Sequence, residues 1–402
     1  MADNKDKKVL NVPALRFPEF IKSWECSILE KLSKKIGDGI HSTPSYDDNG
    51  TFYFINGNNL NGGKIVITSS TKRVSEKEAY KNNAENLEAN SILMSINGTI
   101  GNVALYHNEP IMLGKSACYI NSKDNIDKNY LFYYLQYPKT QLYFEAELTG
   151  TTIKNLSLQS IRKTKIYIPT IEEQHKISRF LQKIDERIST QNKIIEKLET
   201  LIKGIVDSIF TANKFPKVPF KEIYVRAGEG GTPATSNPEY YVNGTIPFIK
   251  IDDLLYKYIK TNKDCITELG LQKSSAWIVP ANSIIYSNGA TIGAISINLF
   301  PVCTKQGILG VVPKADINVE FLYYFMSSTA FTKAVERIVT EGTMRTAYLK
   351  DINHIPCPVP CSVKQDEIAK LLSTLSEKLE NEVIFQMKLQ KQKEFLLSQM
   401  FI

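Results

Sequence analysis

A lysine and a serine after a glycine are the nearest this chain comes to a phosphate-binding loop. Lys115 and Ser116 follow Gly114, but such a loop needs another glycine five residues before Gly114, where Glu109 stands. The glycine-rich run at 228–231 lacks the Gly-x-Gly-x-x-Gly spacing of a dinucleotide-binding turn. Neither pattern therefore predicts a nucleotide site.

Metal chemistry is equally poorly supported by the histidines and cysteines. Among the six cysteines only Cys357 and Cys361 are close in sequence, and a zinc site usually needs two such pairs or histidines at set spacing. His354 does not complete a set, and the other histidines are dispersed. We predict structural thiols and no metal.

One short motif raises the possibility of methyl transfer. Asn-Pro-Glu-Tyr at 237–240 is similar to the Asn-Pro-Pro-Tyr motif of adenine methyltransferases, but Glu239 replaces the second proline and no glycine-rich cofactor strand accompanies it. We interpret the motif as a turn and predict no catalytic residue in this chain.

The chain is an internal repeat with a spacing of about 190 residues. Ala-Asn-Ser-Ile occurs at 89–92 and 281–284, Thr-Ile-Gly at 99–101 and 291–293, and an aromatic run at 130–134 returns at 321–325. Short β-rich runs at 51–55 and 91–96 alternate with Gly/Asn turns, and an aromatic helix is predicted near 129–137, before Pro138. Two similar units suit a two-fold-like partner such as duplex DNA with two half-sites.

Each copy closes with a long helix whose apolar positions follow a heptad pattern. The first seam, interrupted by Gln191, is roughly 50 Å long at 1.5 Å per residue and comprises Ile177, Leu181, Ile184, Ile188, Ile195, Leu198, Ile202, Ile205 and Ile209. The second comprises Ile368, Leu372, Leu375, Leu379, Leu389, Leu396 and Met400. Because Glu382, Gln386 and Lys393 interrupt the second seam, Val383 and Phe385 could compensate by a shift in register.

An exposed seam would forfeit on the order of 10 kcal/mol, so each helix needs a partner. A globular unit lies between the two helices in sequence, and a pair related by a two-fold axis runs antiparallel. We predict an α+β fold with two pseudo-two-fold-related globular domains separated by a long antiparallel two-helix coiled coil. A homodimer, in which each helix pairs with a second chain, is the alternative.

Charge and hydropathy favour a soluble protein with a polyanionic partner. The net charge is +7, and the excess of basic residues lies in 1–170 and 214–360, whereas 171–213 and 361–402 are balanced. No stretch approaches the roughly 20 apolar residues of a membrane span. The first eight residues lack the apolar core of a secretory signal, so we expect a cytoplasmic location without membrane contact.

Four further motifs are distinctive: Val-Pro-Ala-Leu-Arg-Phe-Pro-Glu-Phe at 12–20 with Trp24, Thr-Pro at 43–44 and 232–233, Thr-Ile-Gly in both copies, and Pro-x-x-x-x-Gln-x-x-Ile at 169–177. With these motifs the layout resembles the DNA-specificity subunit of type I restriction–modification systems over nearly the whole chain. The second copy departs from the pattern, with Lys364 where Glu173 stands in the first.

The resemblance implies target-recognition domains at 1–170 (folded from about residue 12) and 214–361, with spacer helices at 171–213 and 362–402. It implies a bipartite target in double-stranded DNA, one half-site for each domain, with the spacer length set by the coiled coil. It also implies two methyltransferase subunits and translocase–endonuclease subunits as partners, which would hold the catalytic activity and any S-adenosylmethionine, ATP and Mg²⁺. The chain itself would need no cofactor.

The repeat separates candidate DNA contacts into two groups, because phosphate contacts position a protein and base contacts specify the sequence. Residues shared by both copies are candidates for phosphate contact: Lys115, Thr151, Lys154, Lys305, Thr343 and Arg345. Residues that differ at matched places are candidates for base reading: His41, Ser42, Asn58, Asn59, Asn97, Thr232, Asp252, Asp253 and Asn288. The second group could instead be turn residues that bond their own backbone, and Gly98, Gly101 and Gly293 are expected to serve backbone geometry.

Two alternative functions remain open from the sequence. The chain could be a coiled-coil adaptor whose globular units bind proteins, or an adenine-specific DNA methyltransferase in its own right. Binding to mixed DNA would separate the first from a specificity subunit, and binding of S-adenosylmethionine would identify the second.

Overall fold

The computed structural model describes residues 11–82, 84–150, 154–212, 215–289, 291–339 and 345–402. Its contacts divide the chain into two units. The first comprises the described residues up to Gln191 together with Phe385–Ile402, and the second comprises Asn192–Ile384.

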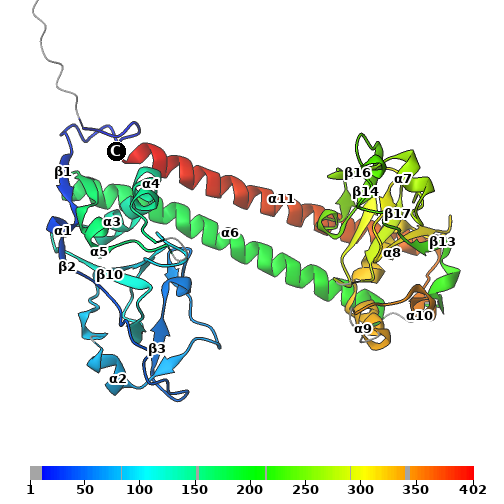
Figure 1. Ribbon diagram of the computed structural model, residues 1–402, viewed down its shortest axis with the longest axis horizontal. Helices are drawn as coiled ribbons and strands as arrows, with labels where there is room; N and C mark the ends of the chain where they lie inside the picture. The colour runs from blue at the N-terminus through cyan, green and yellow to red at the C-terminus, as the bar shows by residue number, and fades with distance from the viewer. Residues whose placement is uncertain (1–10, 83, 151–153, 213–214, 290, 340–344) are drawn as a thin grey trace, which may run out of the picture. The chain divides into compact units, whose positions relative to one another are not determined.

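A four-stranded antiparallel sheet forms the centre of the first unit, in the order β2-β10-β7-β8. Figure 1 labels two of its strands, β2 and β10. Its strands are β2 (Ser33–Asp38), β7 (Ser91–Ser95), β8 (Val103–Leu105) and β10 (Ala117–Ser122). A second sheet contains β3 (Phe52–Ile55), β6 (Arg73–Val74) and β9 (Ile111–Leu113), with β3 and β9 parallel. Two pairs complete the strands: β1 (Glu25–Ile28) with β11 (Lys165–Ile168), and β4 (Leu60–Asn61) with β5 (Lys64–Ile65).

The helices of the first unit include the predicted aromatic helix, which is α3 (Lys128–Leu135). Asp127 caps it by accepting the Asn129 N–H at 2.8 Å. Pro138 does not simply end this segment, because it is the first residue of α4 (Pro138–Ala146), a position where its missing N–H costs no hydrogen bond. The remaining short helices are α1 (Leu29–Leu32), α2 (Glu76–Lys81), α5 (Leu158–Lys163), η1 (Gly57–Asn59) and η2 (Ala84–Asn86).

The second unit repeats this sheet with one further strand, in the order β13-β20-β17-β18-β15. Its strands are β13 (Tyr224–Glu229), β15 (Tyr258–Ile259), β17 (Ser283–Ser287), β18 (Ile295–Asn298) and β20 (Ile308–Pro313). The others are β14 (Ile246–Ile249), β16 (Asp264–Ile266) and β19 (Cys303–Thr304) in a second sheet, and β12 (Lys217–Pro219) paired with β21 (Pro356–Pro358). The repeated sequence therefore folds into the same strand order twice.

The helices of the second unit follow one another along the chain in an order similar to that of the first unit. They are α7 (Glu268–Gln272), α8 (Val319–Ser327), α9 (Thr329–Ile338), α10 (Leu349–Ile352), η3 (Phe220–Glu222), η4 (Pro238–Tyr240) and η5 (Ile251–Asp253). The Asn-Pro-Glu-Tyr motif is the turn we predicted, since Asn237 Oδ1 accepts the Glu239 N–H at 3.1 Å at the start of η4.

The two long helices are α6 (Ile171–Ala212, 42 residues) and α11 (Ser362–Met400, 39 residues), and both contribute to each unit (Figure 1). In the first unit Ile177, Leu181, Ile184 and Ile188 of α6 share a buried core with Leu389, Leu396 and Met400 of α11. In the second unit Ile202, Ile205 and Val206 of α6 share one with Ile368 and Leu372. The start of one helix thus packs with the end of the other, which confirms an antiparallel pair within a single chain.

The predicted shift in register along α11 is wrong. Val383 and Phe385 are exposed, whereas Glu382, Gln386 and Lys393 are partly buried in phase with Leu375, Leu379 and Leu389. Lys393 remains in the seam because its Nζ lies 2.8 Å from Asp185 Oδ1, and Asp185 also accepts the Tyr133 hydroxyl at 2.8 Å. An ion pair therefore occupies this seam position, where the first copy has Ile202.

Matching glutamines explain the motif before each long helix. The Gln174 side chain accepts the Asp127 N–H at 3.1 Å and donates to the Pro169 carbonyl at 3.0 Å. Gln365 makes the same two bonds, with Asn318 at 2.9 Å and Pro360 at 2.9 Å. Each buried amide thus joins the aromatic helix to the start of the long helix.

The neighbouring position differs between the copies. Buried Glu173 holds Arg16 through two hydrogen bonds of 2.7 and 2.8 Å and accepts the Trp24 indole N–H at 3.3 Å. Lys364, its counterpart, is exposed and pairs with Glu367 at 2.9 Å. The 12–20 motif is therefore tied to α6 by a carboxylate that the second copy does not have.

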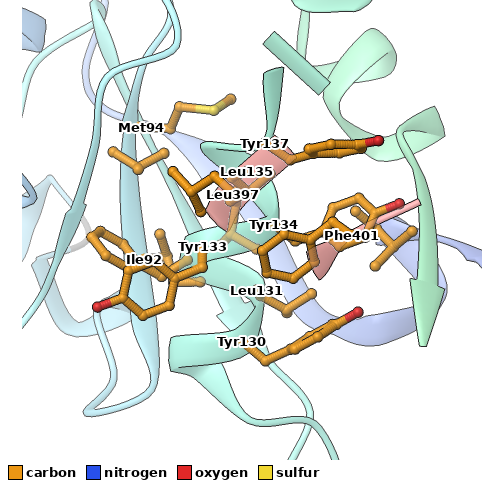
Figure 2. Close-up of a cluster of buried hydrophobic side chains, with 14 of the residues drawn as sticks. Ile92, Met94, Tyr130, Leu131, Tyr133, Tyr134, Leu135, Tyr137, Leu397 and Phe401 are labelled. Atoms are coloured by element: carbon orange, nitrogen blue, oxygen red, sulfur yellow. The ribbon is translucent and has the colours of Figure 1, made fainter. Parts of the chain in front are cut away.

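The end of the chain completes the core of the first unit (Figure 2). Phe401 is buried against the rings of Tyr130, Tyr134 and Tyr137, with centroid distances of 5.5, 5.3 and 5.9 Å. Phe210 has the corresponding role in the second unit, 5.4 Å from both Phe321 and Phe325. Burial raises the pKa of the Tyr130 and Tyr134 hydroxyls, which remain protonated donors to the Tyr167 and Ile402 carbonyls.

A buried lysine gives the second unit a pH-dependent contact. Lys257 Nζ lies 3.4 Å from Glu320 Oε2 and donates to Ser373 Oγ at 2.8 Å. Burial alone would raise the pKa of Glu320, but hydrogen bonds from Ser373 and Tyr258 and the charge of Lys257 lower it overall.

Because the folded pKa is lowered, the Glu320 carboxylate should make its full contribution to the stability of the second unit above its unfolded pKa of about 4.3. The contribution is lost as pH falls through the lower folded value. Glu320→Gln should destabilise the unit at pH 7 by about 1–3 kcal/mol, and the difference from wild type should shrink on acidification. Urea unfolding at pH 7 and pH 3.5 measures this. A difference that is independent of pH would contradict it.

Candidate nucleic-acid interface

One edge of the main sheet in the first unit brings together most of the predicted contact residues. Asp38 ends β2 beside Cys118, and Ser95 ends β7 beside Ala117, the first residue of β10. β8 begins at the same edge, where Val103 pairs with Met94. Because antiparallel neighbours place the end of one strand beside the start of the next, segments 39–42, 96–102 and 114–116 emerge together. We call this the loop edge.

Hydrogen bonds join two further segments to this loop edge. Gly57, in the turn after β3, donates its N–H to Ser116 Oγ at 2.9 Å, and its carbonyl accepts Thr99 Oγ1 at 3.1 Å. Asn97 forms an antiparallel bridge with Asn155, the neighbour of Lys154. Residues from five separate places in the sequence therefore share one surface.

The second unit has the same loop edge. β13 and β17 end there at Glu229 and Ser287, and β20 begins there at Ile308, opposite Ser287. Equivalent backbone hydrogen bonds hold the loops of the two units. Gly101 N–H bonds the Ser95 carbonyl at 2.9 Å, and Gly293 N–H bonds the Ser287 carbonyl at 3.0 Å. Leu156 N–H bonds the Ile96 carbonyl, and Ala347 N–H bonds the Asn288 carbonyl, both at 2.9 Å. Lys154 lies two residues before Leu156, and Arg345 lies two residues before Ala347. The two basic residues therefore occupy equivalent positions in the fold.

Glycine is required at the turns of these loops, as expected. Gly98, Gly101 and Gly293 have φ values of +73°, +83° and +106°, in a region that side chains disfavour. At Gly101 a Cβ would also lie 2.3 Å from Gln141 Oε1.

Eight of the predicted contact residues are exposed on or beside the two loop edges. They are His41, Ser42, Asn58, Lys115 and Lys154 in the first unit and Asp252, Lys305 and Arg345 in the second. The His41 imidazole is held by Asp38, with Nε2 2.8 Å from Oδ2. Asn97 and Thr232 are partly buried, and Thr232 Oγ1 accepts the Gln306 N–H at 3.3 Å. Their roles in DNA contact remain predictions.

Asn59 and Asp253 hold their own turns. Asn59 Oδ1 accepts the Asn56 N–H at 3.0 Å and its amide donates to the Val66 carbonyl at 3.1 Å. Asp253 Oδ2 accepts the Lys250 N–H at 2.9 Å. These bonds support the turn role for Asn59 and Asp253. Base reading stays a prediction for them, as it does for their exposed neighbours Asn58 and Asp252.

The prediction for Asn288 is corrected. Its side chain is completely buried and donates to the Ala347 carbonyl at 3.1 Å, so it holds the segment after Arg345 and cannot reach a base.

The sequence match of Lys115 with Lys305 is displaced by one residue. Gly114 N–H bonds the Ile55 carbonyl at 2.8 Å, and the equivalent bond, to Ile249 at 3.0 Å, comes from Lys305. Lys305 therefore occupies the place of Gly114, and Gln306 that of Lys115. Both lysines are exposed, but at adjacent positions rather than equivalent ones. Thr151 and Thr343 lie outside the described residues.

The sequence analysis did not identify the polar side chains whose hydrogen bonds hold the loops of the loop edge in place. Ser116 Oγ donates to Asn56 Oδ1 at 2.9 Å, and Glu229 Oε1 accepts the Gly307 N–H at 2.6 Å. The Gly-Lys-Ser run at 114–116 does not have the spacing of a phosphate-binding loop, and no role was predicted for Ser116. Its bonds to the 56–57 turn give it a structural role.

The described residues include neither a metal site nor a reactive buried thiol. No group of three or more His, Cys, Asp or Glu among them could hold a metal ion. Burial raises the pKa of Cys118 to about 12 and of Cys303 to about 11, which keeps both thiols protonated and unreactive. Within the described chain, no helix is long and apolar enough to cross a membrane.

The chain matches proteins of type I restriction–modification systems. The family model described as the type I restriction modification DNA specificity domain matches twice, over residues 22–200 and 217–388. A putative type I restriction enzyme specificity subunit, MjaX, from Methanocaldococcus jannaschii is 25% identical over 390 residues, covering 90% of this chain and 89% of that protein. The MjaIX specificity subunit from the same organism is 31% identical over 164 residues, which is 40% of this chain and 38% of that protein.

Solved structures show the same fold. The type I restriction–modification S subunit from M. genitalium superposes with a TM-score of 0.56 at 19% identity, over 97% of this chain and 99% of that one. A chain from a study of complex assembly in the type I system gives a TM-score of 0.60 at 15% identity, over 94% and 97%. Since the family model covers most of the sequence in two copies, this chain belongs to the type I restriction–modification DNA specificity family.

Proposed function

We propose that each unit binds one half of a bipartite site in double-stranded DNA through its loop edge, and that the helix pair fixes the number of base pairs between the halves. The supporting observation is that one loop edge is built twice on the same strand order, with exposed Lys154 and Arg345 at equivalent positions. A basic side chain retained at matched places suits the phosphate backbone, which is common to all sequences.

The exposed residues that differ between the two loop edges would read the bases. Asn58 can pair with adenine through its amide, and Asp252, at the matched place, can accept from the cytosine amino group. Such a difference allows two edges with the same backbone to prefer different half-sites. His41 and Ser42 in the first unit offer further donors and acceptors.

We propose further that the chain is non-catalytic and directs partner subunits. Two methyltransferase subunits would bind along the helix pair, and translocase–endonuclease subunits would join them for cleavage. S-adenosylmethionine, ATP and Mg²⁺ would then be bound by these partners, and the complex would work in the cytoplasm. The lack of a nucleotide motif in the sequence supports this division of roles.

Replacing either equivalent basic residue tests the phosphate role. Lys154→Ala and Arg345→Ala should each weaken binding to all DNA sequences alike and reduce the slope of log K against log salt by about one unit, because one phosphate contact is lost. The assay is a salt titration of the complex with its methyltransferase subunits on specific and mixed duplexes.

Exposed lysines at the opposite end of the same sheets provide controls. Lys123 follows the far end of β10 and Lys260 follows the far end of β15. Lys123→Ala and Lys260→Ala should leave the slope unchanged. If all four variants behave alike, or none changes the slope, the loop edge is not the DNA-binding surface.

A further inference from the structure

Two large apolar side chains project next to the loop edge of the second unit. Leu255 is 71% exposed and Tyr256 is 73% exposed. They precede β15, which pairs in parallel with β18. Parallel strands begin at the same edge of a sheet, so these residues lie where the 291–294 loop enters β18. They therefore adjoin the surface that we propose binds DNA.

The backbone on both sides of this pair is firmly held. Leu254 is buried before it, and buried Lys257 follows it. The Tyr256 carbonyl accepts Ser296 Oγ at 2.7 Å, and the Lys257 carbonyl accepts the Ile297 N–H at 2.7 Å. The Lys257 ammonium is in turn anchored by Glu320 and Ser373. Two apolar side chains are thus presented to solvent from a fixed segment.

The first unit has a different pair at the matched place. Counting on from the two equivalent turns, η1 and η5, Leu254 corresponds to buried Leu60, and Leu255 and Tyr256 correspond to Asn61 and Gly62. Since both copies keep the buried leucine, packing does not require the exposed apolar pair that follows it in the second copy. The difference points to a task that only the second unit performs.

We propose that Leu255 and Tyr256 form an apolar wedge that unstacks one base step in the half-site bound by the second unit; this inference rests on the proposed function. Apolar side chains inserted at a base step separate the stacked bases and kink the duplex. A tyrosine ring can then stack on an exposed base, which strengthens binding. Lys257 and Leu254 keep the wedge in position, so little conformational freedom is lost on binding.

The test uses the complex of this chain with its methyltransferase subunits, on a duplex carrying the site found by sequencing methylated adenines in cells. Permanganate detects unstacked pyrimidines and diethyl pyrocarbonate detects unstacked purines. The variant is Leu255→Ser with Tyr256→Ser. The control is Val225→Ser, because Val225 is 72% exposed at the far end of β13 from the loop edge.

Wild type and the Val225 variant should show reactive bases at one step of the second half-site. The double variant should lose that reactivity and bind about tenfold more weakly, as expected for one lost stacking contact. Identical reactivity in all three proteins would overturn the wedge. Loss of methyltransferase assembly with unchanged DNA probing would also overturn it and assign the pair to a protein contact. The proposed function would survive either result as long as the salt slope still depends on Lys154 and Arg345.

Discussion

Four residues inserted into each long helix should change the spacer of the recognised DNA site without changing either half-site. The insertion points are after Gln191 in α6 and after Ile384 in α11, where each helix passes from one unit to the other. Four residues add about 6 Å of helix, and one base pair occupies about 3.4 Å along a strand. We therefore expect a spacer longer by one or two base pairs.

This expected result follows from the proposed function of the helix pair as a ruler. An insertion of four residues is a stutter, which a coiled coil accommodates by a local change in winding. On the original site the variant could engage only one half at a time. Its binding should fall toward the non-specific level, which is typically at least about a thousandfold weaker.

Sequencing of methylated adenines in cells that carry the variant would measure the new spacer. A control with four residues inserted between Asp48 and Asn49, in an exposed turn of the first unit, should keep the original site. New half-site sequences with an unchanged spacer would show that the helices do not set the distance.

Phe401→Ala should unfold the first unit more readily than any other single truncation on α11 or beyond it. The phenyl ring fills the space between Tyr130, Tyr134 and Tyr137 (Figure 2), so its removal leaves a cavity next to three hydroxyl-bearing rings that cannot easily collapse. Large-to-small changes of this kind cost about 3–5 kcal/mol. Urea unfolding with limited proteolysis would report the loss and identify the unit affected.

The chain offers matched controls for this experiment. Phe395, also in the last part of α11, is 60% exposed, so Phe395→Ala should cost little. Phe210→Ala should produce a loss of similar size but in the second unit, where Phe210 packs on Phe321 and Phe325. Equal stability of the Phe401 and Phe395 variants would mean that the chain end does not support the first unit.

The repeat made several features of the fold predictable from the sequence. Short aromatic and β-branched runs specify strands through local patterning, and a seam of isoleucines and leucines every three or four residues specifies a helix that needs a partner. Pro-x-x-x-x-Gln was recognisable as the start of that helix, but the reason for its glutamine was not. Gln174 reaches Asp127, which is 47 residues away in sequence.

Side-chain burial separates the candidate DNA-contact residues that face solvent from those that hold the protein's own turns. Asn58 and Asn59 are neighbours of the same type, yet one faces solvent and the other caps its turn. Asn288 and Lys305 were misplaced for a related reason, since their equivalents are defined by backbone bonds across the sheet and not by spacing along the chain. The exposed pair Leu255 and Tyr256 gave no signal in the sequence, because an apolar residue before a strand is usually buried.

The sequence by itself determined that this chain is a two-copy α+β protein with a long heptad helix after each unit, and it indicated the family. Both follow from local periodicity and repetition, which are properties of residue order. Only the tertiary structure decided that five dispersed segments meet at one loop edge in the first unit, that Lys393 finds Asp185 in the seam, and that Phe401 closes the core of the first unit. Those contacts join residues far apart in sequence, and they exist only after the strands pair and the helices pack.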